Sequence, residues 1–165
     1  KPKTDIGPLI SLAHLLKIHE QVQDALSKGA KLLCGGRYEG QLYWPTVVSG
    51  ITPEMRIYYE EVFGPARPVI SVSDENEAIK AANDPIYGLS SGIMTGDVNK
   101  ALLMAKRLEF GMVHINDSPV NDEPHIPFGG IKGSGMGREG GMYSIQELTE
   151  LKWITIQQTR KTFPI

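Results

Sequence analysis

Apolar residues recur along the first third of the chain at two different spacings. Across positions 9–26 they fall mostly three or four residues apart, which predicts an amphipathic helix that Gly29 ends. The short apolar run Lys31–Cys34 predicts a buried strand. Residues 43–49 are rich in β-formers, and Pro45 within them indicates a sheet edge or the start of a strand.

Strands and helices then alternate through the middle of the chain. The pattern predicts, in order, a strand at 68–72, a helix at 74–83, a strand at 90–95, a helix at 97–107 and a strand at 111–116. Alternation at this spacing is typical of βαβ units. We therefore predict an α/β fold with a mostly parallel sheet flanked by helices.

Periodicity almost disappears in the final third of the chain. Residues 117–141 show no helical or strand pattern, and seven glycines fall between Gly129 and Gly141. A loop longer than about 15 residues inside a compact domain usually serves a function. A short helix is predicted near Tyr143–Glu147, followed by a β-rich tail at Leu151–Thr159.

Composition narrows the class of protein. The 165 residues fit one domain, and a net charge of −2 with scattered Lys and Arg gives no case for nucleic-acid binding. No apolar run approaches the roughly 20 residues of a membrane span, and Cys34, as the single cysteine, cannot form an intrachain disulfide. We expect a cytoplasmic protein. Because the chain opens at Lys1 without Met, we also expect that the whole protein is longer.

Two short glycine motifs match known patterns only in their letters. Gly135–Gly140 fits G-x-G-x-x-G, but a phosphate-binding role needs a preceding strand, so we favour a tight loop. Gly88–Gly92 fits G-x-S-x-G, with Ser90 as a candidate nucleophile and His114 or His125 as its base. The predicted order of helix then strand is the reverse of the order that a nucleophile elbow requires.

The cysteine and the histidines offer no other chemistry. Cys34 ends an apolar strand without a neighbouring His, so we predict a buried structural cysteine and not a reactive thiolate. His14 and His19 are five residues apart and miss the i, i+4 spacing of a helical metal site. No metal site is predicted.

Two longer stretches are far more specific. Residues 60–65 read E-E-V-F-G-P, and residues 127–139 read P-F-G-G-I-K-G-S-G-M-G-R-E. Both resemble signatures of the aldehyde dehydrogenases, and weaker matches at 4–10, 87–93 and 113–116 stand in the same order. The resemblance covers nearly the whole chain.

The resemblance implies roles for residues at the cofactor. Glu61 matches the acid that accepts hydrogen bonds from the nicotinamide ribose hydroxyls, a role that suits an ionised carboxylate. Phe63 matches the aromatic residue that packs beside the nicotinamide ring. The alternative interpretation is a carboxylate at a strand edge and a core phenylalanine. NAD or NADP is the implied cofactor.

It also implies roles at the substrate. Phe128 matches an aromatic residue of the substrate tunnel, and the loop 117–126 occupies the region that shapes this tunnel. The sequence of that loop most resembles the branch of the family that acts on benzaldehyde, salicylaldehyde or vanillin. Asn116 and Val120 are therefore candidate substrate-binding residues.

Glu139 is the one catalytic candidate that the resemblance supplies. It matches an acid assigned to a water and proton path near the nucleophile. Its alternative interpretation is a salt-bridge partner for Arg138 or Lys132 in a rigid loop.

By resemblance, residues 1–148 form the C-terminal part of a catalytic domain, and 149–165 form an oligomerisation β tail. The nucleophilic cysteine and the general-base glutamate lie upstream of the position of Lys1, so we expect the chain alone to be inactive. The whole protein would oxidise an aldehyde to a carboxylic acid as a homodimer or homotetramer. Two alternatives remain, a serine hydrolase using Ser90 and a non-enzymatic domain that pairs strands.

Overall fold

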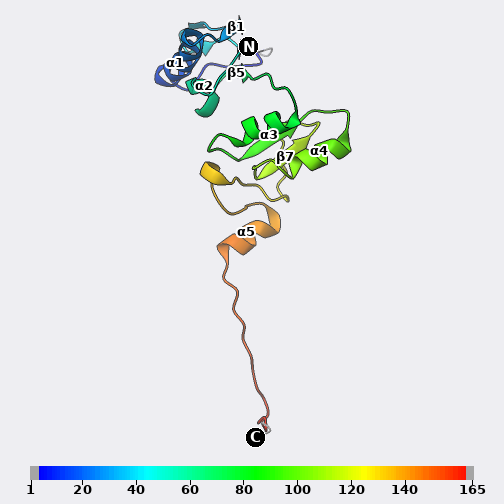
Figure 1. Ribbon diagram of the computed structural model, residues 1–165. Coiled ribbons are helices and arrows are strands. Elements are labelled where there is room, and N and C mark those ends of the chain that lie inside the picture. The colour runs from blue at the N-terminus through cyan, green and yellow to red at the C-terminus, as the bar shows by residue number, and fades with distance from the viewer. Residues whose placement is uncertain (1–3, 163–165) are drawn as a thin grey trace.

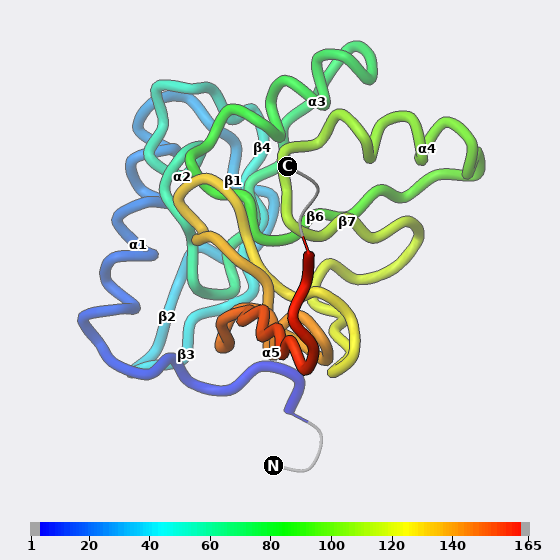
Figure 2. Tube along the Cα trace, turned by 90° about the horizontal axis from the view of Figure 1, so that it is seen from below, coloured from blue at the N-terminus to red at the C-terminus, as the bar shows by residue number. Residues whose placement is uncertain are grey.

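The computed structural model describes residues 4–162 and has the predicted α/β composition (Figure 1). The first half contains α1 (Leu12–Ser27), β1 (Lys31–Cys34), β2 (Tyr38–Glu39), β3 (Leu42–Tyr43), β4 (Thr46–Ser49), α2 (Arg56–Tyr59) and β5 (Ala66–Val69). The second half contains α3 (Glu75–Asn83), β6 (Ser90–Ile93), α4 (Val98–Ala105), β7 (Met112–Ile115), the 3₁₀ turn η1 (Lys132–Ser134) and α5 (Gly141–Leu148). The two halves form separate bodies joined by the segment between β5 and α3, and α1 and α4 lie on opposite sides in Figure 2.

The first body holds a three-stranded sheet in the order β1-β4-β5. Strands β4 and β5 are parallel, with Thr46 opposite Ala66, whereas β1 runs antiparallel to β4. Pro45 stands directly before β4, so the prediction of a strand start is confirmed. The edge prediction is wrong because β4 is the central strand.

Helix α1 supplies much of the core of this body. The Ser11 hydroxyl accepts a hydrogen bond from the His14 backbone N–H at 3.2 Å and caps the helix N-terminus. One face of the helix is buried, with Leu15, Ile18 and Val22 almost inaccessible to solvent. Each such side chain contributes about 1.5–3 kcal/mol when buried. The resulting core cluster spans α1, the sheet and α2.

Strand β1 departs from the prediction. All four of its residues are exposed, including Leu32, Leu33 and Cys34. An apolar run predicts that its side chains favour burial, but it does not show which surface would cover them. The prediction that β1 and Cys34 are buried is therefore wrong for this chain.

The second body contains a βαβ unit formed by β6, α4 and β7, with the two strands parallel from Ser90 opposite Met112 to Ile93 opposite Ile115. Asp74 and Asp97 cap α3 and α4, because each side chain accepts hydrogen bonds from backbone N–H groups of the following turn. The α/β prediction with parallel strands is confirmed. The parallel pairs belong to two small sheets of the described chain.

This second body has a thin core. Its buried apolar residues are Ile79, Ile93 and Ala101, whereas Leu102 and Leu103 of α4 are exposed. Gly111 lies so close to the backbone of Gly129 that a Cβ atom at position 111 would overlap its carbonyl oxygen. The glycine-rich loop therefore packs directly against the backbone at the start of β7.

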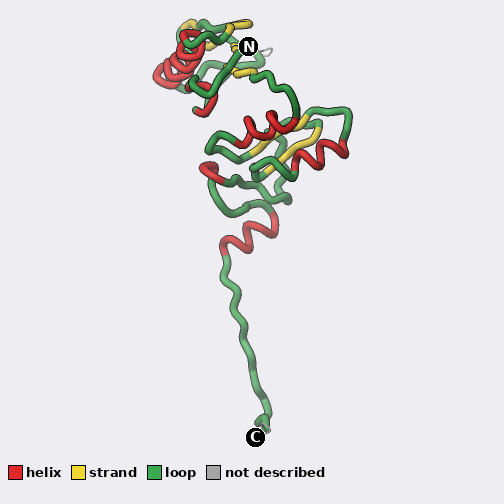
Figure 3. Tube along the Cα trace, viewed as in Figure 1, coloured by secondary structure: helices red, strands yellow, loops and turns green. Residues whose placement is uncertain are grey.

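The tail that follows α5 contacts little of the rest of the chain. The predicted helix is confirmed as α5, but residues 149–162 form no strand and are exposed along their length (Figure 3). The alternative of an edge strand on the chain's own sheet is therefore not seen in the described part of the tail. Residues 163–165 of the predicted tail domain lie outside the described residues. No helix within residues 4–162 is long and apolar enough to cross a membrane.

Candidate functional site

Glu61 and Phe63 lie on the loop between α2 and β5. Both side chains are exposed, Phe63 by 70%. They line an open pocket of about 540 Å³ together with Val120, which comes from the second body. The structure thus brings the two predicted cofactor-binding residues beside one predicted substrate-binding residue. It rules out the alternative of a core phenylalanine at position 63.

Glu60, the neighbour of Glu61, is held quite differently. Its carboxylate accepts two hydrogen bonds from the Arg56 guanidinium, at 2.8 and 3.1 Å, and one from the Gln21 amide at 3.0 Å. The hydrogen bond from Arg56 is the main reason that the pKa of Glu60 is lowered. Of the two adjacent glutamates, Glu60 is bound by Arg56 and Gln21, and the exposed Glu61 lines the pocket.

Two further residues contact this loop, and neither was predicted as part of the site. His14 and Gln21 of α1 both form hydrogen bonds to the loop, His14 at the carbonyl oxygen of Phe63 and Gln21 at Glu60. The contacts join residues 39 and 49 positions apart. No local motif signals a pairing of that range.

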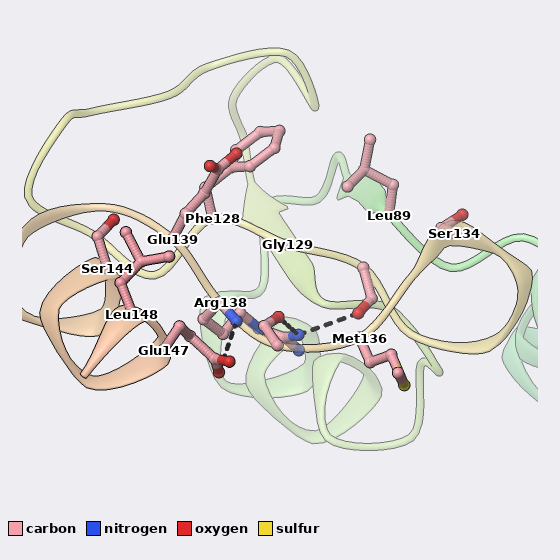
Figure 4. A pocket seen from close by; sticks show the side chains of 12 residues that line it. Leu89, Phe128, Gly129, Ser134, Met136, Arg138, Glu139, Ser144, Glu147 and Leu148 are labelled. Carbon is pink, nitrogen blue, oxygen red and sulfur yellow. Dashed lines mark hydrogen bonds between the residues drawn. The ribbon is translucent and has the colours of Figure 1, made fainter. Parts of the chain in front are cut away.

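Phe128 and Glu139 are paired through their backbones and line a second pocket of about 390 Å³ (Figure 4). Each backbone N–H donates to the other residue's carbonyl oxygen at 2.8 Å. The predicted substrate residue and the predicted proton-path residue therefore lie next to each other. They stand on the second body and do not line the pocket of Glu61.

The carboxylate of Glu139 does not pair with the cations proposed for it. Arg138 donates instead to the carbonyl oxygens of Gly130 and Gly137, at 3.0 and 2.6 Å, and Figure 4 shows it turned away from Glu139. Lys132 reaches the carbonyl oxygen of Asn83 at 2.6 Å. The salt-bridge interpretation of Glu139 is therefore wrong for this structure.

The loop 117–126 carries Val120 and is held partly by its own residues. The Asp117 carboxylate accepts hydrogen bonds from the Ser118 backbone N–H and the Asn121 amide, both at 2.7 Å. These bonds lower the pKa of Asp117, the backbone bond most. Contacts with the rest of the second body complete the loop, because the Gly141 backbone N–H donates to the carbonyl oxygen of Pro124 at 2.9 Å and the Ser90 hydroxyl donates to that of Pro119.

Asn116, before this loop, has a backbone role. Its φ of 57° lies in the left-handed region, which Asn tolerates better than most residues. Its side-chain oxygen accepts a hydrogen bond from the Thr95 backbone N–H at 2.8 Å and so ties the ends of β6 and β7 together. Asn116 lines neither pocket. Its predicted contact with substrate stays a prediction.

The remaining candidates show no catalytic arrangement. Ser90 begins β6, and its hydroxyl donates to the carbonyl oxygen of Pro119, so no histidine of the described residues activates it. Gly135–Gly140 connects η1 to α5 with no strand before it. Within residues 4–162 no three His, Cys, Asp or Glu side chains converge as metal ligands would.

The fold and the two pockets define the class of protein. It is an α/β domain whose candidate site is built on loops between helices and strands, an arrangement that many α/β enzymes share. The model of the aldehyde dehydrogenase family matches residues 1–154. The chain belongs to the aldehyde dehydrogenase family.

Individual relatives extend this result. A salicylaldehyde dehydrogenase of Pseudomonas sp. (strain C18) is 44% identical over 159 residues, which is 96% of this chain and 33% of that protein. A benzaldehyde dehydrogenase [NAD(+)] of Pseudomonas putida is 42% identical over 160 residues, again 96% and 33%. The crystal structure of a salicylaldehyde dehydrogenase from Pseudomonas putida G7 complexed with salicylaldehyde has a TM-score of 0.90 at 44% identity, over 97% of this chain and 33% of that one. The chain spans about a third of the length of these relatives.

Proposed function

We propose that this chain supplies the nicotinamide-side and substrate-side residues of an NAD- or NADP-dependent aldehyde dehydrogenase that oxidises an aromatic aldehyde to a carboxylic acid. One observation carries the proposal. Glu61, Phe63 and Val120 line the same pocket, although Val120 lies far from the other two in the sequence. The identification of the family supports the same chemistry.

The residues present fit the nicotinamide end of a dinucleotide. Within residues 4–162 no side chain or backbone N–H donates to the Glu61 carboxylate, so both oxygens are available to ribose hydroxyls. The exposed ring of Phe63 offers a flat apolar face beside it. When bound, the cofactor would accept a hydride from the substrate. Glu61 and Phe63 would hold its reactive end in place.

Several features favour an aromatic substrate. Relatives of this chain include dehydrogenases named for salicylaldehyde and benzaldehyde. The second body offers apolar surface at Phe128 and at Val120, which is 86% exposed. Burial of a substrate's aromatic ring against such a surface would stabilise the complex. We assign Phe128 and Val120 to substrate binding and Glu139 to the proton path.

We further propose that the chain alone does not turn over aldehydes. Thiolate attack on the carbonyl carbon begins the expected chemistry. Cys34, the one cysteine, lies in β1 and lines neither pocket of the described chain. The exposed apolar surfaces of β1 and α4 support the view that further chain covers them in the complete protein.

The test compares the complete protein with the isolated chain. Formation of NADH or NADPH is followed with salicylaldehyde, benzaldehyde and vanillin, and with acetaldehyde as the non-aromatic control. We expect turnover by the complete protein only, with kcat/KM highest for the aromatic aldehydes. Equal or higher kcat/KM for acetaldehyde would overturn the aromatic assignment, and turnover by the isolated chain would overturn its predicted inactivity. Labelling of Ser90 by a fluorophosphonate would instead support the hydrolase alternative.

A further inference from the structure

Helix α1 contacts the backbone of the loop that carries Glu61 and Phe63. The Nε2 atom of His14 lies 2.6 Å from the carbonyl oxygen of Phe63. A carbonyl oxygen can only accept, so Nε2 carries the proton and donates. The bond acts on the peptide group of Phe63 and leaves its ring exposed.

A second residue of α1 contacts the loop from two helical turns further along. The side chain of Gln21 is fully buried, and its amide donates to the Glu60 carboxylate at 3.0 Å and approaches the carbonyl oxygen of Glu61 at 3.5 Å. His14 and Gln21 are seven residues apart, so they lie on one face of α1. A hydrogen bond made by a buried amide is costly to lose, because the amide would stay unpaired.

Between these two contacts the helix and the loop touch directly. Ile18, on the same face of α1, lies so close to Gly64 that a Cβ atom at position 64 would overlap its side chain. Ile18 itself is 1% exposed and packed in the core. The loop therefore rests on a rigid surface and is held at both ends by polar contacts.

We propose that His14 and Gln21 are positioning residues, which fix the loop backbone so that the Glu61 carboxylate and the Phe63 ring meet the nicotinamide end in one geometry. This rests on the proposed function of Glu61 and Phe63. Neither positioning side chain lines the pocket, so each acts only through the loop groups that it contacts, His14 through the peptide carbonyl of Phe63 and Gln21 mainly through the carboxylate of Glu60. A misplacement of about 1 Å at a reacting centre can slow a reaction by about 10²-fold.

The experiment uses the complete protein and measures hydride transfer in a single turnover, with melting temperature alongside. His14→Phe removes the donor but keeps a flat ring, and His14→Gln restores an N–H at the position of Nε2. His19→Phe is the matched control, because His19 lies on the same helix but contacts the Tyr43 hydroxyl at 3.2 Å and not the loop. Glu61→Ala reports on the proposed function itself. Gln21→Met serves as a second variant, which removes the amide at similar volume.

We expect His14→Phe and Gln21→Met each to slow hydride transfer by about three- to tenfold, the equivalent of one hydrogen bond. His14→Gln should restore most of the rate, and His19→Phe should leave it unchanged.

Three results would overturn the positioning role. The first is a normal rate in both His14→Phe and Gln21→Met while Glu61→Ala is slow. The second is a rate in His14→Gln as low as in His14→Phe, and the third is loss of folding in both His14→Phe and Gln21→Met. A normal rate in Glu61→Ala would overturn the proposed function on which the role rests.

Discussion

The two adjacent glutamates of the E-E-V-F-G-P motif are expected to respond to substitution in different ways. In the complete protein, Glu61→Ala removes the carboxylate of an exposed residue that lines the pocket, whereas Glu60→Ala removes one that is bound to Arg56 and Gln21. We predict that Glu61→Ala impairs cofactor use without loss of stability. Glu60→Ala should lower stability, and it should slow hydride transfer only as far as the loss of its hydrogen bond to Gln21 does.

The magnitudes follow from the contacts that each carboxylate makes. A hydrogen bond to a charged group is worth about 1.5–3 kcal/mol, so losing one or both ribose contacts at Glu61 should cost about tenfold or more in hydride transfer or cofactor affinity. Glu60→Ala leaves the buried Gln21 amide with only the 3.5 Å contact to Glu61, at a cost of about 1–3 kcal/mol. The lost Arg56 pair, spaced i, i+4 and about one-third exposed, adds about 0.3–0.5 kcal/mol.

Stopped-flow hydride transfer, cofactor titration and urea denaturation of both variants measure these effects. The midpoint of denaturation should fall for Glu60→Ala and stay at the wild-type value for Glu61→Ala. Hydride transfer in Glu60→Ala should slow by about three- to tenfold, as in Gln21→Met, because both variants lose the hydrogen bond between Gln21 and Glu60. Unchanged hydride transfer and cofactor affinity in Glu61→Ala would refute the reasoning, and so would a wild-type denaturation midpoint in Glu60→Ala.

Further predictions concern the tail, the cysteine, the glycine contact and pH. We expect the chain to associate through its tail, because Leu151, Trp153, Ile154 and Ile156 are highly exposed. Deletion of 151–165 should therefore yield a monomer or an aggregate in light scattering. An intact chain that is monomeric at micromolar concentration would contradict this. Cys34→Ser in the complete protein should leave kcat nearly unchanged. Gly111→Ala should lower the melting temperature, because the added Cβ would overlap the carbonyl oxygen of Gly129 and cost about 1–3 kcal/mol of stability. The Arg56 guanidinium lowers the pKa of Glu60. The stability that the ionised Glu60 contributes is therefore present above its ordinary pKa of 4.5 and is lost as the pH falls through the lower pKa of the folded protein. Urea denaturation at a series of pH values checks this.

The long regular elements were predictable because their signals are local. Helix α1 shows its buried stripe in the spacing of its apolar residues, and Asp74 and Asp97 mark the starts of α3 and α4 by their capping chemistry. Helix α2 and the hairpin of β2 and β3 were not predicted. They are four and two residues long per element, too short to show a period.

Burial was harder to predict than element type. Leu33 of β1 and Trp153 of the tail have strong apolar preferences but are exposed, since nothing in the described chain packs over them. At the site, Glu61 and Phe63 could be found from their motif. His14 and Gln21 could not, because a helical period shows that they share a face but not which loop this face contacts.

The two loops at this pocket are anchored to different parts of the chain, which has a consequence for loop grafting. Loop 117–126 is fixed within the second body, through Asp117 and through the backbone carbonyls of Pro119 and Pro124. The loop of Glu61 is fixed by α1 of the first body. A loop grafted from a relative in place of 117–126 is therefore expected to leave the anchors of the Glu61 loop in place.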